Sequence, residues 1–92
     1  MKTKMRETSL LAYAEALEHL GENQQHVLVT MRLLKTANNQ MIARELDWPI
    51  NSVTPRVKEL RDRKLAQVAF TAPDLFTGRK TIYWKPTRRQ IW

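Results

Sequence analysis

Apolar residues recur at helical spacing through the first two-thirds of the chain, and the pattern then changes to a period of two. Apolar residues three and four positions apart share one face of a helix, whereas alternation is typical of a strand. The pattern predicts four helices, over residues 9–20, about 22–35, about 39–47 and about 52–64. It then predicts two strands, over residues 66–71 and 80–85, joined by a loop that holds Pro73 and Gly78.

The apolar faces of these elements define the expected core. Its helical members are Leu10, Tyr13, Ala14, Leu17, Leu20, Val27, Leu28, Met31, Leu34, Ile42, Ala43, Leu46, Val53, Val57 and Leu60. In the strands, Val68, Phe70, Ile82 and Trp84 alternate with other residues. Trp48 and Trp84 are expected to be core aromatics.

Capping residues set the helix boundaries. Asn38 is the expected cap of the third helix, and Pro49 disfavours helical geometry before it, so this helix should end by Asp47 or Trp48. Asn51 or Ser52 can cap the fourth helix. Ser52 is favoured because Pro55 then lies in the first turn, where its missing N–H costs nothing.

The charge of the chain is concentrated in its second half. Residues 1–50 hold six Lys/Arg and six Asp/Glu, whereas residues 51–92 hold ten Lys/Arg and three Asp/Glu, so the second half carries the whole net charge of +7. A half-molecule with this imbalance attracts polyanions. The basic residues fall on the fourth helix, the loop between the strands and the C-terminal end.

Composition argues against several other classes of protein. The 92 residues make one domain without cysteine, so neither disulfides nor thiolate metal sites are expected. No apolar run approaches the length of a membrane span, and the first residues lack a signal-peptide core, so we expect a soluble, cytoplasmic protein. The two histidines lie four residues after Glu15 and Glu22, a spacing that usually stabilises a solvated helix face. We therefore predict no enzyme, no metal and no cofactor.

Residues 23–85 resemble a winged helix-turn-helix domain, most closely the small phage- and prophage-encoded winged-helix proteins. The resemblance is carried by residues 46–60, which align without gaps with that family's turn and recognition helix. Leu65 matches the residue that opens the first wing strand, and residues 77–80 are similar to the wing tip. Two positions depart from the family: Asp47 in the turn and Lys64 before the wing stand where glycine is usual.

The resemblance implies an α+β, mostly helical fold: a three-helix core with a helix-turn-helix, a β-hairpin wing and an extra N-terminal helix. The expected organisation is a disordered N-terminus (1–8), an N-terminal helix (9–21), the winged-helix domain (22–86) and a basic tail (87–92). The N-terminal helix either covers the core or forms the seam of a homodimer, and the sequence leaves both open.

The function that follows is sequence-specific binding of double-stranded DNA, with helix 52–64 in the major groove and wing 71–81 on backbone or minor groove. The candidate residues are Asn51, Ser52, Thr54, Pro55, Arg56, Lys58 and Arg61 on the helix, Thr77, Gly78, Arg79 and Lys80 on the wing, and Arg88 and Arg89 in the tail. Arg56 is the expected base-reading residue, because a guanidinium bonds guanine bidentately. Lys58, Arg61, Arg79 and Lys80 are assigned to phosphates.

Three roles are consistent with a winged-helix fold of this kind. The first is a transcriptional regulator of phage or bacterial type. The second is a replication or recombination accessory protein that binds DNA. The third is a winged-helix protein–protein docking module, such as a phage protein that binds a host factor, which would use the same core and a different surface.

Overall fold

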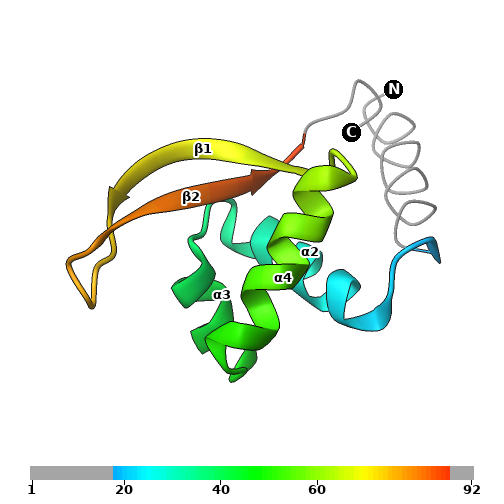
Figure 1. Cartoon of the computed structure of the whole chain (residues 1–92), viewed down its shortest axis with the longest axis horizontal. Helices are drawn as coiled ribbons and strands as arrows, with labels where there is room; N and C mark the ends of the chain where they lie inside the picture. Colours follow the sequence, from blue (N-terminus) through cyan, green and yellow to red (C-terminus); the bar gives the residue numbers. More distant parts are fainter. Residues whose placement is uncertain (1–17, 88–92) are drawn as a thin grey trace, which may run out of the picture.

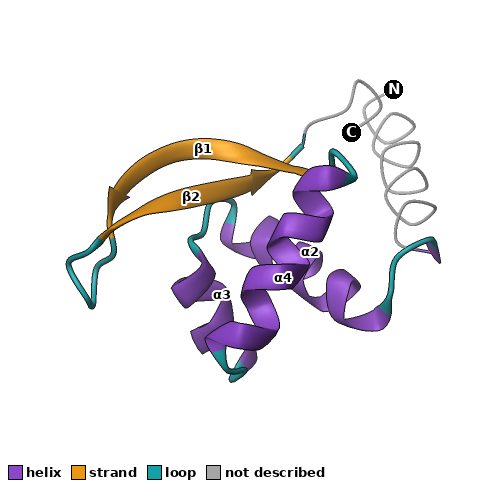
Figure 2. Ribbon diagram, viewed as in Figure 1, coloured by secondary structure: helices purple, strands orange, loops and turns teal. Residues whose placement is uncertain are grey.

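The computed structural model describes residues 18–87 (Figure 1). Three helices, α2 (Glu22–Leu34), α3 (Asn39–Leu46) and α4 (Ile50–Asp62), precede an antiparallel hairpin of β1 (Ala66–Pro73) and β2 (Lys80–Pro86). The curved hairpin arches over one side of the helices (Figure 2). This is the element order of a winged helix, so the predicted α+β fold is confirmed. The helix expected at residues 9–20 lies, except for its last residues, outside the described part.

The core lies between the three helices and the start of the hairpin. Its fully buried helical side chains come from the stripes expected from the sequence, namely Val27, Leu28, Met31, Ile42, Val53, Val57 and Leu60. Burying one such side chain contributes about 1.5–3 kcal/mol. Helix α4 contacts both other helices and β1, so it is held from three sides. None of the helices in residues 18–87 is long and apolar enough to cross a membrane.

Helix α3 begins and ends as its sequence predicts. The Oδ1 atom of Asn38 accepts a hydrogen bond from the Met41 N–H at 2.8 Å, which confirms the predicted cap. At the other end Asp47 is left-handed, with φ 57°, and the Trp48 N–H donates to the Ala43 carbonyl at 2.9 Å. This bond, with that from the Asp47 N–H to Arg44, is the Schellman pattern that closes a helix.

The prediction that Ser52 caps the fourth helix is wrong. Helix α4 begins at Ile50 with Pro49 as its cap residue, and Ser52 lies in the first turn. Ile50 packs against the core, and this contact makes Ile50 the first residue of the helix, ahead of the predicted cap Ser52. Pro55 therefore lies inside the helix and leaves the Asn51 carbonyl without its usual N–H donor. Because Asn51 is exposed, water can reach that carbonyl.

Helix α4 ends in a left-handed residue that is not glycine. Lys64 has φ 63°, its N–H donates to the Arg61 carbonyl at 2.9 Å, and the Leu65 N–H donates to the Leu60 carbonyl at 2.8 Å. These two bonds form a second Schellman pattern. Both departures from the family's glycines, Asp47 and Lys64, thus coincide with left-handed backbone.

A bulge in β1 divides the hairpin residues between two faces. Val68 pairs with Trp84 and Phe70 with Tyr83, so Ala69 is the extra residue. Trp84 is buried in the helical core, whereas Phe70 stacks on Tyr83 with ring centroids 4.7 Å apart. The simple alternation of the sequence does not reveal this change of face.

The connector between α2 and α3 is fixed to the second strand. The Ala37 N–H donates to the Trp84 carbonyl at 2.9 Å, and the Trp84 N–H donates to the Ala37 carbonyl at 2.8 Å. This antiparallel bridge lies immediately before the cap residue Asn38. It fixes the start of α3 relative to the wing.

The left-handed lysine at the end of α4 makes a testable prediction about stability. A non-glycine residue in this conformation costs about 1–2 kcal/mol, so Lys64→Gly should stabilise the fold by about 1 kcal/mol. For a domain of this size that raises the Tm by about 4–8 °C, measurable by thermal unfolding. Lys58→Gly, in the middle of the same helix, is the control and should destabilise by about 1 kcal/mol. Destabilisation by both variants would contradict the prediction.

Candidate nucleic-acid interface

Helix α4 presents an exposed ridge opposite its buried stripe. Val53, Val57 and Leu60 face the core, and the residues on the far side are exposed: Asn51, Thr54, Pro55, Lys58, Arg61 and Asp62. Five of the candidate residues on the helix are therefore exposed, namely Asn51, Thr54, Pro55, Lys58 and Arg61, whereas Asp62 was not a candidate. The ridge begins in the first turn of the helix, which is the part that reaches base edges in helix-turn-helix proteins.

Arg56 lies on the flank of α4 that faces α2. Its Nε and Nη2 atoms donate to the two carboxylate oxygens of Glu59, both at 2.8 Å. The Gln24 side chain of α2 donates to the same carboxylate at 2.7 Å. The bond from Arg56, and then that from Gln24, lower the pKa of Glu59. The guanidinium expected to read a base is therefore half-buried and already paired with a carboxylate. Ser52 lies on the same flank and is half-buried.

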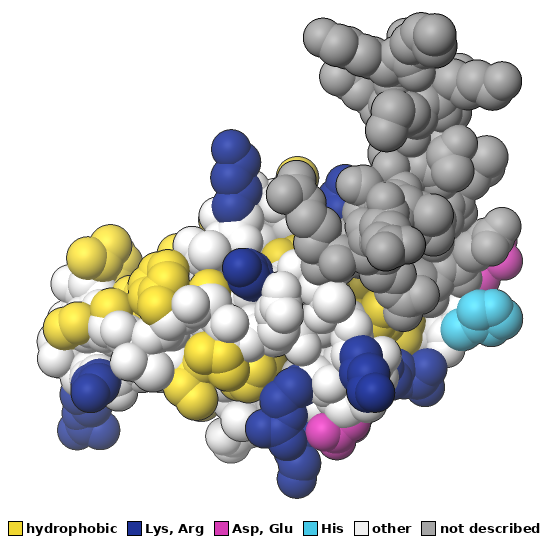
Figure 3. Space-filling model, turned by 90° about the horizontal axis from the view of Figure 1, so that it is seen from above, with side chains coloured by type: hydrophobic (Ala, Val, Ile, Leu, Met, Phe, Trp, Pro, Cys, Tyr) yellow, Lys and Arg dark blue, Asp and Glu magenta, His cyan; other side chains and the backbone are white. Residues whose placement is uncertain are grey.

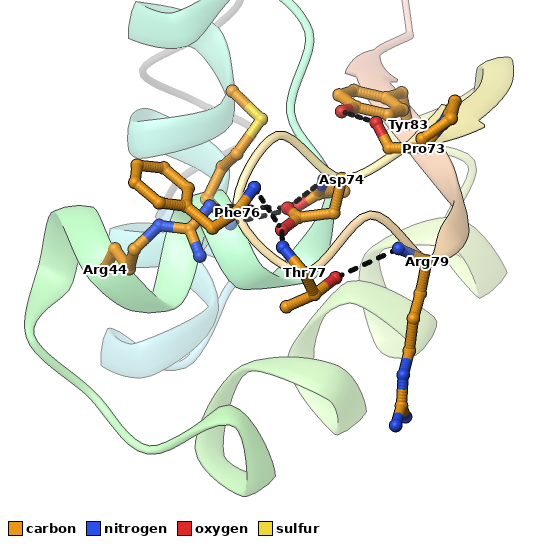
Figure 4. A network of polar contacts seen from close by, with 9 residues as sticks. Arg44, Pro73, Asp74, Phe76, Thr77, Arg79 and Tyr83 are labelled. Atoms are coloured by element: carbon orange, nitrogen blue, oxygen red, sulfur yellow. Dashed lines mark hydrogen bonds and ion pairs between the residues drawn. The ribbon is translucent and has the colours of Figure 1, made fainter.

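The wing loop is built around the buried carboxylate of Asp74 (Figure 4). Its Oδ2 atom accepts hydrogen bonds from the main-chain N–H groups of Phe76 at 3.0 Å and Thr77 at 2.9 Å. The Gly78 N–H donates to the Asp74 carbonyl, and the Asp74 N–H donates to the Arg79 carbonyl, both at 2.8 Å. Gly78 has φ 72°, which this tight loop requires.

The same carboxylate attaches the loop to α3. The Asn38 Nδ2 atom donates to Asp74 Oδ1 at 2.9 Å, and the Arg44 guanidinium donates to that oxygen at 3.3 Å. The N–H of Thr77, then the amide of Asn38, hold the pKa of Asp74 well below its usual range. Asp74 was not among the predicted site residues. The available signal was an Asp at the start of a loop, where its side chain can bond N–H groups further along.

One side of the wing loop faces the start of α3 across an open cleft. The cleft, of about 440 Å³, is lined by Gln40, Asp74, Thr77, Arg79, Lys80 and Thr81. Gln40 is exposed and was not predicted as a site residue. Its neighbour Asn39 donates to the Thr54 hydroxyl at 3.4 Å, so the start of α3 touches the ridge of α4. The ridge, the start of α3 and the wing therefore form one continuous surface, which we call the basic face.

The cations of the basic face are largely free of acidic partners. No acidic side chain among residues 18–87 pairs with Lys58, Arg79 or Lys80, whereas Arg61 lies 3.4 Å from Asp62. Figure 4 shows the Arg79 side chain extending away from the loop network. In Figure 3, Lys and Arg project along the lower edge, the side that faces the reader in Figure 1. Arg88 and Arg89 lie outside the described residues.

The described residues offer no evident metal centre. They hold no cluster of three or more His, Asp or Glu side chains that could bind an ion. His26 lies 3.9 Å from Glu22, and its ring meets Trp48 edge-on at 5.7 Å between centroids. These contacts place His26 on the surface of α2 beside the turn before α4.

Comparison with known proteins identifies the architecture. No family model and no curated protein matches the sequence. Among solved structures, a mutant of Lactococcus lactis ZitR in its apo form is similar, with a TM-score of 0.55 and 18% sequence identity. The likeness covers 98% of this chain and 62% of that chain. At this identity it shows a shared fold, and the chain is a winged-helix protein by architecture.

The buried carboxylate of Asp74 predicts a pH-dependent contribution to stability. Its pKa is lower in the folded than in the unfolded chain, so its stabilisation is complete above the unfolded pKa of about 3.9. The stabilisation is lost as the pH falls below that value through the folded pKa. Asp74→Asn should therefore lower the free energy of unfolding at neutral pH, and its difference from the wild type should shrink in acid.

Urea unfolding of both proteins from neutral to acid pH measures this difference. Asp62→Asn is the matched control, because that carboxylate is exposed and its ion pair with Arg61 contributes little. A difference for Asp74→Asn that stays constant across the acid range would contradict the assignment.

Proposed function

We propose that this protein binds double-stranded DNA through its basic face, with α4 in the major groove and the wing on the adjacent backbone or minor groove. The observation that carries the proposal is the continuity of that face. The contact of Asn39 with Thr54, and the cleft between Gln40 and the wing, join the ridge of α4 to the cations of the loop. A regulator of phage or bacterial type, acting by occupying its site, is the role we favour.

Base reading is best assigned to the first two turns of the exposed ridge. Asn51 is exposed, and a carboxamide can bond adenine N6 and N7 together. Thr54 is one turn further on the ridge, and its hydroxyl can bond either type of base. Arg56 would first have to leave Glu59, with which it makes two hydrogen bonds. We therefore assign Arg56 to orienting Glu59, whose carboxylate also accepts a hydrogen bond from Gln24 of α2.

Affinity is assigned to phosphate contacts. Lys58, Arg79 and Lys80 can each neutralise a phosphate and release counterions, and Arg61 can do so after leaving Asp62. The start of α4 adds to this, because no side chain caps its first N–H groups. Free N–H groups at a helix N-terminus bind phosphate oxygens.

The proposal is tested by binding the full chain to a randomised duplex pool at near-physiological salt and sequencing the retained DNA. An enriched motif is the expected result, and its symmetry reports whether one copy or two occupy the site. Retention that is lost as the salt rises, without any enriched motif, would overturn sequence-specific recognition. No retention at all would overturn DNA binding.

The assignment of base reading predicts a difference between two neighbouring residues. Asn51→Ala should cost about 1–3 kcal/mol of binding free energy on the selected duplex and relax the preference at one base pair. Arg56→Ala should leave the sequence preference unchanged. Titrations against single-base variants of the selected duplex measure both. If Arg56→Ala is the variant that relaxes the preference, the guanidinium leaves Glu59 on binding and the assignment is wrong.

The assignment of the wing predicts a change in salt dependence. Neutralising Arg79 and Lys80 together, as Arg79→Gln and Lys80→Gln, should weaken binding equally on all sequences and shallow the salt slope by about 2. The matched control neutralises Lys35 and Lys85, which are exposed and do not line the wing cleft. Equal salt slopes for the two double variants would contradict the assignment of the wing to the DNA interface.

A further inference from the structure

The wing loop has a second side, which is apolar. Leu75 and Phe76 are adjacent and are 86% and 76% exposed, and a contiguous exposed apolar patch can mark an interaction site. They border a cleft of about 370 Å³ lined by Leu34, Met41, Arg44, Glu45, Leu75 and Phe76. None of these residues lines the cleft of the basic face. The cleft of the basic face therefore does not account for this apolar surface.

The loop holds the two apolar side chains in different ways. The Phe76 N–H is bonded to Asp74, and the Arg44 guanidinium lies 4.1 Å from the centre of the Phe76 ring. Phe76 thus forms one wall of the cleft, with its ring against the Arg44 guanidinium. Leu75 is more exposed and projects beside it, so a protruding side chain and an open cleft lie next to each other on one surface.

We propose that this surface binds a second copy of the chain, in a two-fold contact in which Leu75 of each protomer enters the cleft of the other. A two-fold interface uses the same patch twice, so a patch that fits itself must carry a projection and a matching depression. Leu75 and the cleft between Phe76, Leu34 and Met41 provide the two parts. Each insertion removes an exposed leucine and part of an apolar cleft from water.

The charges at the rim agree with self-association. Arg44 and Glu45 are adjacent residues of opposite sign on the same cleft. A two-fold axis between two such rims brings Glu45 of one protomer toward Arg44 of the other, twice. The chain as a whole carries a net charge of +7, so two copies repel each other elsewhere. Because Arg44 also pairs with Asp74 at 3.3 Å, this rim carries no excess positive charge, and two copies can approach there with less repulsion than over the cationic surface.

The small size of the patch sets the strength of the contact. Six residues cannot cover the roughly 800 Å² per partner of a typical stable interface, so the dimer should be weak in free solution. The contact would become effective where two copies are held close together, because linkage raises their effective concentration. Adjacent sites on one duplex would do this, and this last step alone rests on the proposed DNA binding.

Sedimentation equilibrium of the full chain from micromolar to millimolar concentration, without DNA, tests the contact directly. We expect a weak monomer–dimer equilibrium, with concentration-dependent amide NMR shifts gathered at Leu34, Met41, Leu75 and Phe76. Leu75→Ser should lower the association constant about a hundredfold or more, because each dimer loses two buried leucines. Leu33→Ser is the matched control, because Leu33 is 77% exposed on α2 but does not line the cleft.

Several outcomes would overturn the proposal. The first is a chain that stays monomeric up to millimolar concentration. The second is an equal loss of association in Leu75→Ser and Leu33→Ser, and the third is a set of concentration-dependent NMR shifts centred away from the cleft. Glu45→Arg should also weaken association, since it places like charges across the two-fold axis. This arm contains no DNA, so its failure is separate from any failure of DNA binding.

A second experiment compares binding to a shorter duplex, which holds one copy of the protein, with binding to a longer duplex, which holds two. The wild type should bind the longer duplex cooperatively, and Leu75→Ser should lose that cooperativity while keeping its affinity for the shorter one. If Leu75→Ser instead weakens binding to the shorter duplex, Leu75 contacts DNA and the second-copy assignment is overturned.

Discussion

The hydrogen bond between Asn38 and Asp74 joins residues 36 positions apart, and the arrangement of the wing depends on it. Both side chains are buried, so neither can exchange its partner for water without exposing the loop. Asn38 also caps α3 through its other amide atom. One amide therefore fixes the start of α3, which lies against the ridge of α4, to the loop that carries the wing cations. The geometry of the basic face follows from this connection.

The same anchoring gives the wing loop two distinct sides. Because the Asp74 carboxylate holds the N–H groups of Phe76 and Thr77, the loop backbone is fixed rather than adaptable. Polar and basic residues then line the cleft toward Gln40, and apolar ones line the cleft toward Leu34. A loop of this kind can contact two partners at once, since neither side has to rearrange for the other.

The local features of the chain could be read from the sequence, and those that depend on a neighbouring element could not. The Asn38 cap and the end of α3 at Asp47 follow from short-range chemistry and are confirmed. The cap of α4 was predicted wrongly, because packing of Ile50 against the core outweighed the preference of Ser52. Arg56 was expected to read a base. Instead, Glu59 holds it on the flank of α4 that faces α2. Gln24 of α2, which lies 35 positions from Glu59 in the sequence, donates a hydrogen bond to the same carboxylate.

By itself, the sequence determined the order of helices and strands, the buried stripes and the concentration of positive charge in the second half. These depend on residue spacing and composition, which local backbone geometry converts directly into faces. Only the tertiary structure decided that Asp74 is the anchor of the wing, that Gln40 joins the basic face and that Leu75 stands beside an apolar cleft. Each of these features depends on contacts between residues that are far apart in the sequence. Residue spacing and composition do not indicate which of these residues pack together in the fold.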